Sequence, residues 1–222
     1  MKWVNKPLTI IIIEGLEKGG PLDLAASLFV GSGVNSELGI ARNRRKIDRL
    51  TQRIFKETDR GELTDCVSVK YPTLEELSAY FQRLRITGKS RYEHRVQHAL
   101  DSMLSNERHY KVGSTLALTA LFMLVADKMG IKELGAYDCS GYMFPRYFGF
   151  GHDLGHSLSY PIRRIDTEEH KRMMRRKQAI SKEGIIACLA EKTADRSVMA
   201  HHYTKAERFT GYAGFFLQRT QG

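Results

Sequence analysis

The pattern of hydrophobic and polar positions in the N-terminal quarter of the chain predicts one strand followed by two helices. Residues 8–13 form an unbroken, mostly β-branched apolar run, which is typical of a buried strand. Residues 23–30 predict a short apolar helix, and Gly31-Ser32-Gly33 then breaks the chain. From about Ser36 to Thr58, apolar residues recur three, four or seven positions apart on one stripe, so we expect a long amphipathic helix there.

The patterns continue in the second half of the chain. Residues 114–129 are almost entirely apolar and stop at Gly130, which predicts a buried helix. Residues 135–155 are rich in glycine and aromatic side chains, and we expect them to be irregular, with the rings packed on helices. The last third predicts three helical stretches: 167–179, 182–194 and 201–216.

The segment 65–104 combines several local signals in a fixed order. Residues 66–71 alternate strictly, as a strand does, and Pro72 ends the run. A capping box at 73–76 opens a helix whose apolar face holds Leu74, Leu77, Phe81 and Leu84, and Gly88 closes it. A second capping box at 90–93 opens another helix, with Val96, Ala99 or Leu100, and Met103 on its stripe.

A single short strand exposes both of its hydrogen-bonding edges and is not stable alone. We therefore expect a two-fold dimer, in which two copies of residues 66–71 pair as an antiparallel ribbon over four helices. Such a ribbon fits the major groove of DNA. The expected dimer core is Val67, Val69, Tyr71, Leu77, Phe81 and Val96.

This order of strand, helix, glycine turn and helix resembles the ribbon-helix-helix family, the class of the Arc and MetJ repressors. The resemblance covers residues 66–104 and rests on the strand ending in Tyr71-Pro72, the turn at 88–90 and the helix opening at 90–93. It implies base contacts from the outward strand residues Cys66, Ser68 and Lys70. It also implies phosphate contacts from Lys89, Ser90 and Arg91, at a helix N-terminus that favours anions. Cys66 departs from the long polar side chains usual at its position. The competing interpretation is an ordinary β-α-α segment of an α+β domain.

The chain of 222 residues carries a formal net charge of +10, which favours an anionic partner such as nucleic acid. Most of this excess lies outside 63–104: residues 36–60 hold eight basic and four acidic side chains, and residues 161–182 hold eight and three. We expect phosphate contacts there from Arg42, Arg44, Arg45, Arg49, Arg172, Arg175 and Arg176. The alternative for each segment is a solvated helix face without a binding role. An alternative function, binding of RNA or of a membrane surface, would use these two basic segments alone.

Two enzymatic interpretations compete around residues 151–156. His152, Asp153 and His156 have the spacing of metal ligands and look like part of an HD-type phosphohydrolase, with His94 or His98 and Asp166 or Asp195 completing the set. The same string is similar to tyrosine recombinases, with Tyr203 as nucleophile, but Gly155 replaces the arginine that would hold the phosphate. We therefore expect no catalytic activity, metal or cofactor.

The sequence thus predicts a mainly α protein with a short β-ribbon, an α+β arrangement. We expect three parts: an N-terminal extension (1–62), a ribbon-helix-helix module (63–106) and a C-terminal helical region for dimerisation and further DNA contact (107–222). Three widely spaced cysteines exclude a disulfide framework, and we expect a cytoplasmic protein that does not bind membranes. The expected function is a homodimeric, sequence-specific regulator of transcription, activator or repressor, on palindromic or repeated operators in double-stranded DNA. Its length suits plasmid or mobile-element genes, including those for conjugation.

Overall fold

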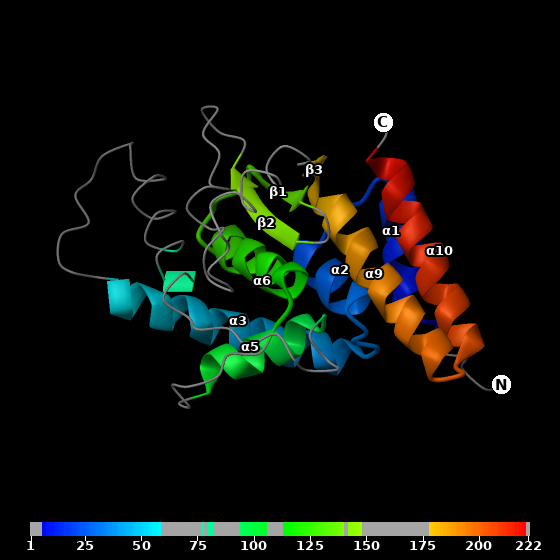
Figure 1. Ribbon diagram of the computed structural model, residues 1–222, viewed down its shortest axis with the longest axis horizontal. Coiled ribbons are helices and arrows are strands. Elements are labelled where there is room, and N and C mark those ends of the chain that lie inside the picture. The colour runs from blue at the N-terminus through cyan, green and yellow to red at the C-terminus, as the bar shows by residue number, and fades with distance from the viewer. Residues whose placement is uncertain are drawn as a thin grey trace. The chain divides into compact units, whose positions relative to one another are not determined.

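The computed structural model describes residues 6–58, 77, 80–81, 94–105, 113–139, 142–147 and 178–220. These residues form a mostly helical protein with one small antiparallel sheet, which agrees with the expected α+β class (Figure 1). The elements are α1 (Leu8–Glu17), α2 (Leu24–Gly31), α3 (Glu37–Thr58), α5 (Val96–Leu104), α6 (Thr115–Lys128), β1 (Leu134–Cys139), β2 (Tyr142–Tyr147), β3 (Gln178–Ile180), α9 (Lys182–Met199) and α10 (Tyr203–Arg219).

The chain divides into two compact units. The first comprises Met1–Arg44 and Lys182–Gly222, and the second comprises Arg45–Ser181. The boundaries at 62 and 106 that the sequence suggested stay a prediction.

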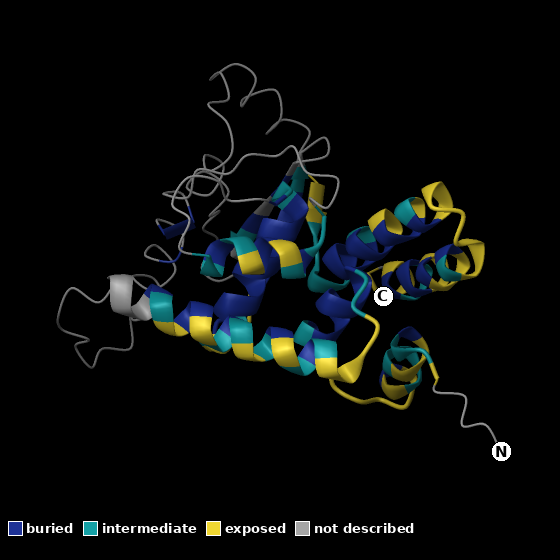
Figure 2. Cartoon of the chain, turned by 90° about the horizontal axis from the view of Figure 1, so that it is seen from below, coloured by how far each residue is buried: buried dark blue, intermediate teal, exposed yellow. Residues whose placement is uncertain are grey.

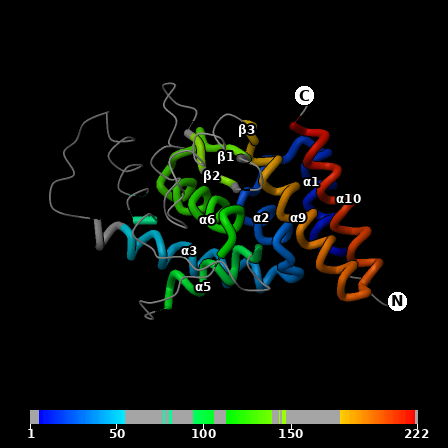
Figure 3. The backbone as a smooth tube through the Cα atoms, viewed as in Figure 1, coloured from blue at the N-terminus to red at the C-terminus, as the bar shows by residue number. Residues whose placement is uncertain are grey.

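The first unit is built around the antiparallel helical hairpin of α9 and α10, whose two helices lie side by side in Figure 3. Helix α2 packs on α9 so closely that a Cβ atom on Gly31 would lie 3.1 Å from the Ile186 carbonyl oxygen. The Thr193 hydroxyl donates a hydrogen bond of 2.7 Å to the Gly31 carbonyl, so α9 also satisfies one of the free carbonyls at the end of α2. The absent side chain of Gly31 therefore sets the distance between these two helices.

Tyr212 of α10 is fully buried in the same core. Its ring packs edge-on against Phe216, with centroids 5.0 Å apart, and its hydroxyl donates to the Ser27 carbonyl of α2 over 3.4 Å. Burial raises the pKa of Tyr212 because the phenolate would lose its hydration. The phenol thus stays neutral and links α10 to α2 by packing and one hydrogen bond.

The second unit packs the sheet, in the order β2-β1-β3, beside helix α6. Residues 116–126 of α6 are buried throughout, and α5 packs against the same helix. Both backbone groups of Met143 in β2 bond to α6: its N–H donates to the Thr115 hydroxyl and its carbonyl accepts from the Thr119 hydroxyl, both at 3.0 Å. Two threonines one turn apart thus satisfy the backbone groups of Met143 on β2, an edge strand of the sheet.

Five helical predictions are confirmed. Helices α2, α3, α6, α9 and α10 lie where the apolar patterns place them, and the Asp23 and Ser114 side chains cap α2 and α6. At Gly130, φ is +80°, and the N–H of Ile131 donates to the Ala126 carbonyl, so a left-handed glycine ends α6 as expected.

The strand predicted at 8–13 is wrong, because these residues form helix α1. A lone strand would leave its backbone groups unpaired, whereas a helix satisfies them internally. The carbonyl of the N-cap residue Pro7 accepts the Ile10 and Ile11 N–H groups, and Gly19-Gly20 ends the helix through bonds to the Leu16 and Gly15 carbonyls. These end signals outweigh the β-branched composition.

The irregular segment predicted at 135–155 is also wrong in its described part. Leu134–Cys139 and Tyr142–Tyr147 pair as an antiparallel hairpin, with Leu134 opposite Tyr147. Their aromatic side chains favour strands, and Pro145 is tolerated because β2 lies at the sheet edge. The helix predicted at 167–179 is wrong at its C-terminal end as well, because Gln178–Ile180 form the strand β3.

Among the helices of the described ranges, none combines the length and the apolarity that crossing a bilayer requires.

His201 follows α9 in a left-handed conformation, with φ of +59°. It occupies the position where helices usually place glycine: its N–H donates to the Val198 carbonyl, and that of His202 to the Ser197 carbonyl. We expect His201→Gly to raise the free energy of unfolding by about 1 kcal/mol, since glycine adopts this conformation without a steric cost. Chemical denaturation measures the change.

The matched control is His202→Gly, whose φ of −97° any residue adopts. This variant should be no more stable than the parent protein. Equal stabilisation by both substitutions would show that the backbone at His201 carries no strain.

Candidate nucleic-acid interface

Helix α3 buries one face completely. Ile40, Ile47, Leu50 and Ile54 are all less than a tenth exposed, as the stripe in the sequence predicted. Figure 2 shows buried and exposed residues alternating along the helix. Because each residue turns the helix by about 100°, this buried stripe fixes which side chains point to solvent.

Three arginines lie on the opposite face of α3. Arg42, Arg45 and Arg49 are exposed, and none of them forms an ion pair or hydrogen bond with any residue that the structure describes. With a rise of about 1.5 Å per residue, they extend over roughly 10 Å along the helix. We call these three residues the basic face of α3.

Other cations of α3 bind acidic or carbonyl partners instead. The Arg44 guanidinium pairs with Asp23, the Lys46 ammonium pairs with Asp101, and the Arg53 guanidinium donates to the Met103 carbonyl over 3.4 Å. Arg44 therefore differs from the three other predicted phosphate ligands of this helix, because its charge is already compensated. The basic face holds the cations that the described residues leave uncompensated on α3.

Two carboxylates of α3 have described side chains, and neither pairs with an arginine of the basic face. Asp48 accepts an ion pair of 2.8 Å from Lys128 of α6, and Glu37 lies at the helix N-terminus. Gln52, which we did not predict, extends the exposed face beyond Arg49. Its place seven residues after Arg45 is the signal that identifies it, since residues seven apart share a helix face.

The remaining predicted contacts cannot be placed. They are the predicted base contacts Cys66, Ser68 and Lys70, the predicted phosphate contacts Lys89, Ser90 and Arg91, and Arg172, Arg175 and Arg176 of the second basic segment. All of these residues lie outside the described part of the chain. So do Val67, Val69 and Tyr71 of the expected dimer core.

Three other members of that expected core are described, and all are buried. Leu77, Phe81 and Val96 are at most 3% exposed, and the Phe81 ring packs edge-on against Phe122 of α6 with centroids 5.3 Å apart. The apolar faces predicted for the two helices of the module are therefore buried at these positions within a single chain. Their part in a dimer stays a prediction.

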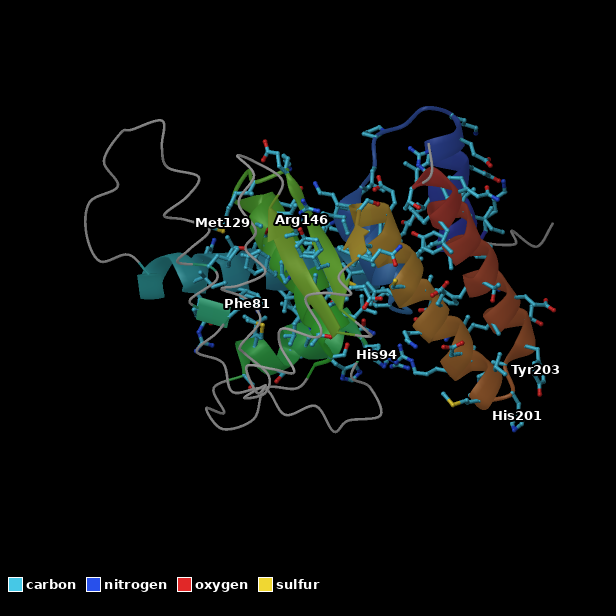
Figure 4. All side chains as sticks on the ribbon, turned by 45° about the horizontal axis from the view of Figure 1, so that its top comes forward. Phe81, His94, Met129, Arg146, His201 and Tyr203 are labelled. Atoms are coloured by element: carbon cyan, nitrogen blue, oxygen red, sulfur yellow. The ribbon has the colours of Figure 1, made fainter. Side chains whose placement is uncertain are left out.

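The residues of the enzymatic alternatives are only partly described. Figure 4 shows His201 and Tyr203 together at the end of the α9–α10 hairpin, where the Tyr203 hydroxyl lies 3.2 Å from His201 Nδ1. Tyr203 is 58% exposed. His152, Asp153, His156 and Asp166 lie outside the described ranges, and within those ranges no three histidine, cysteine or acidic side chains gather as metal ligands would.

No protein-family model, curated protein or solved structure matches the chain.

Proposed function

We propose that the protein binds double-stranded DNA and regulates transcription, with the basic face of α3 supplying phosphate contacts. The observation that supports this is the outward position of three uncompensated arginines above a buried apolar stripe. The planar guanidinium donates two parallel hydrogen bonds to a phosphate and is weakly hydrated, so arginine suits this contact.

The burial of α3 favours nucleic acid over a membrane surface. A helix that lies on a bilayer inserts an apolar face between the lipids. The apolar stripe of α3 is already buried in the protein, and the large apolar side chain that this helix exposes in its described part, Leu38 at 68%, is a single group rather than a face. A row of three exposed arginines suits a polyanion whose charge is regularly spaced.

Sequence readout is assigned to residues 63–106, which we propose form a ribbon-helix-helix module in a homodimer. Two paired strands present Ser68 and Lys70 to the base edges, while Cys66 adds little. B-form DNA admits a β-ribbon in its major groove, whereas the major groove of double-stranded RNA is too narrow. In this arrangement α3 contributes affinity for DNA, and the ribbon contributes sequence specificity.

Replacing one arginine of the basic face should weaken DNA binding without unfolding the protein. We expect Arg45→Gln and Arg49→Gln each to lower the affinity for a labelled duplex by about fivefold, which corresponds to the loss of about 1 kcal/mol. Fluorescence anisotropy at fixed salt concentration measures this change.

Lys46→Gln is the matched control, since it removes the same charge from the same helix at a position already paired with Asp101. It should change the affinity less than twofold. An equal loss in all three variants would mean that total charge, rather than this face, determines binding.

Selection of bound sites from random duplex DNA tests the proposed module. We expect an inverted repeat, because a two-fold dimer reads two half-sites. Lys70→Ala should abolish the preference for that repeat and leave most of the non-specific affinity, since base contacts specify and phosphate contacts bind. Recovery of sequences without symmetry, or an unchanged preference in this variant, would contradict the ribbon.

A further inference from the structure

The first unit contains a pocket of about 650 Å³ that the DNA proposal does not use. Helix α1 contributes Leu8, Ile11 and Ile12 to its lining, and the first turns of α3 contribute Ile40 and Ala41. Ile11 is 43% exposed, so part of this apolar lining faces solvent. The volume falls in the range of small-molecule sites, and the lining is mainly apolar.

Of the two glycines that line the pocket, Gly15 leaves open space, whereas a Cβ atom on Gly20 would lie 2.8 Å from the Gly15 carbonyl oxygen. Gly15 and Gly20 both line it, and the Gly20 N–H donates to the Gly15 carbonyl over 3.0 Å. A Cβ atom added to Gly15 would meet no atom within 4 Å, so the space beside it is empty.

Three charged residues also line the pocket: Asp23, Arg44 and Glu37. Asp23 is fully engaged, since one of its oxygens accepts the Ala26 N–H at 3.0 Å and the other binds Arg44. An anionic ligand would have to compete with Asp23 for Arg44. Glu37 is exposed and has no ion-pair or hydrogen-bond partner in the part of the chain that the structure describes.

The sum of these charges is −1, in a protein whose net charge is +10. The free carboxylate of Glu37 and the apolar walls together define the ligand chemistry: an apolar body with a positive group at one end.

We propose that this pocket binds a small apolar molecule carrying one cationic group, which pairs with Glu37. The apolar body lies between α1 and the start of α3, and the ammonium remains at the solvent edge. This inference does not rest on the proposed DNA function, because the residues that line the pocket include none of the basic face of α3 and none of residues 63–106.

Three probes that differ only in their polar end test the proposal on the full chain: phenylbutylamine, phenylbutanol and phenylbutyrate. At neutral pH we expect the amine to bind best, the alcohol about threefold more weakly and the carboxylate weakest, because an exposed ion pair contributes only modestly to affinity. Titration calorimetry gives the affinities, and the rise in melting temperature gives an independent reading.

Two substitutions locate the site. Gly15→Leu should lower the affinity for all three probes by about tenfold or more, because Gly15 lines the pocket, its Cβ position is open, and the longer side chain would take up volume that the ligand needs. Gly211→Leu is the matched control: this helical glycine of α10 also has open space around it but lies outside the pocket, so binding should not change. Both variants replace a helical glycine by leucine, which favours helices more strongly, so both should remain folded.

Glu37→Gln tests the polar end separately. It should reduce the affinity for the amine to that for the alcohol and leave the alcohol unaffected. The proposal is overturned if no probe binds, if Gly15→Leu binds like Gly211→Leu, or if the carboxylate binds best.

Discussion

Burial of one face of α3 is the constraint on which the arrangement of the basic residues depends. Ile47, Leu50 and Ile54 are at most 2% exposed, and burying each such side chain contributes about 1.5–3 kcal/mol. An exposed ion pair contributes about 1 kcal/mol or less. The apolar stripe therefore sets the rotation of the helix, and the charged side chains adopt whatever positions remain.

Those positions separate the cations of α3 into two groups. Arg44 and Lys46 lie where Asp23 and Asp101 reach them, and their charges are compensated within the protein. Arg42, Arg45 and Arg49 lie on the far side, where the described residues offer no partner. Part of the net charge of +10 is thus concentrated, without compensation from the described residues, on one helix face.

Local sequence patterns predicted the regular helices but not the contacts between distant segments. Helices α3, α6 and α9 have long apolar stripes or runs, and the structure places them as expected. The strand prediction for residues 8–13 is wrong because their β-branched composition favours a strand, while the ends of the segment favour a helix. The glycines and aromatic residues of the β1–β2 hairpin predict irregular structure, because the strand pairing that orders them is not visible in the local pattern.

The candidate sites show the same limit. Arg45 and Arg49 could be predicted from charge and periodicity, because both properties belong to one helix. The pairing of Arg44 with Asp23, 21 residues away, and of Lys46 with Asp101, 55 residues away, depends on tertiary structure. The apolar pocket is also assembled from segments that are far apart in sequence, between Leu8 and Arg44. No local motif marks it.

The salt dependence of DNA binding tests most directly whether the basic face of α3 contacts phosphates. Each phosphate contact releases counterions and adds about 0.9 to the slope of log K against log salt concentration. A variant with glutamine at positions 42, 45 and 49 should therefore show a slope lower by roughly 2 to 3 than the parent protein. A slope that is unchanged in this variant would contradict the assignment, whatever the loss of affinity.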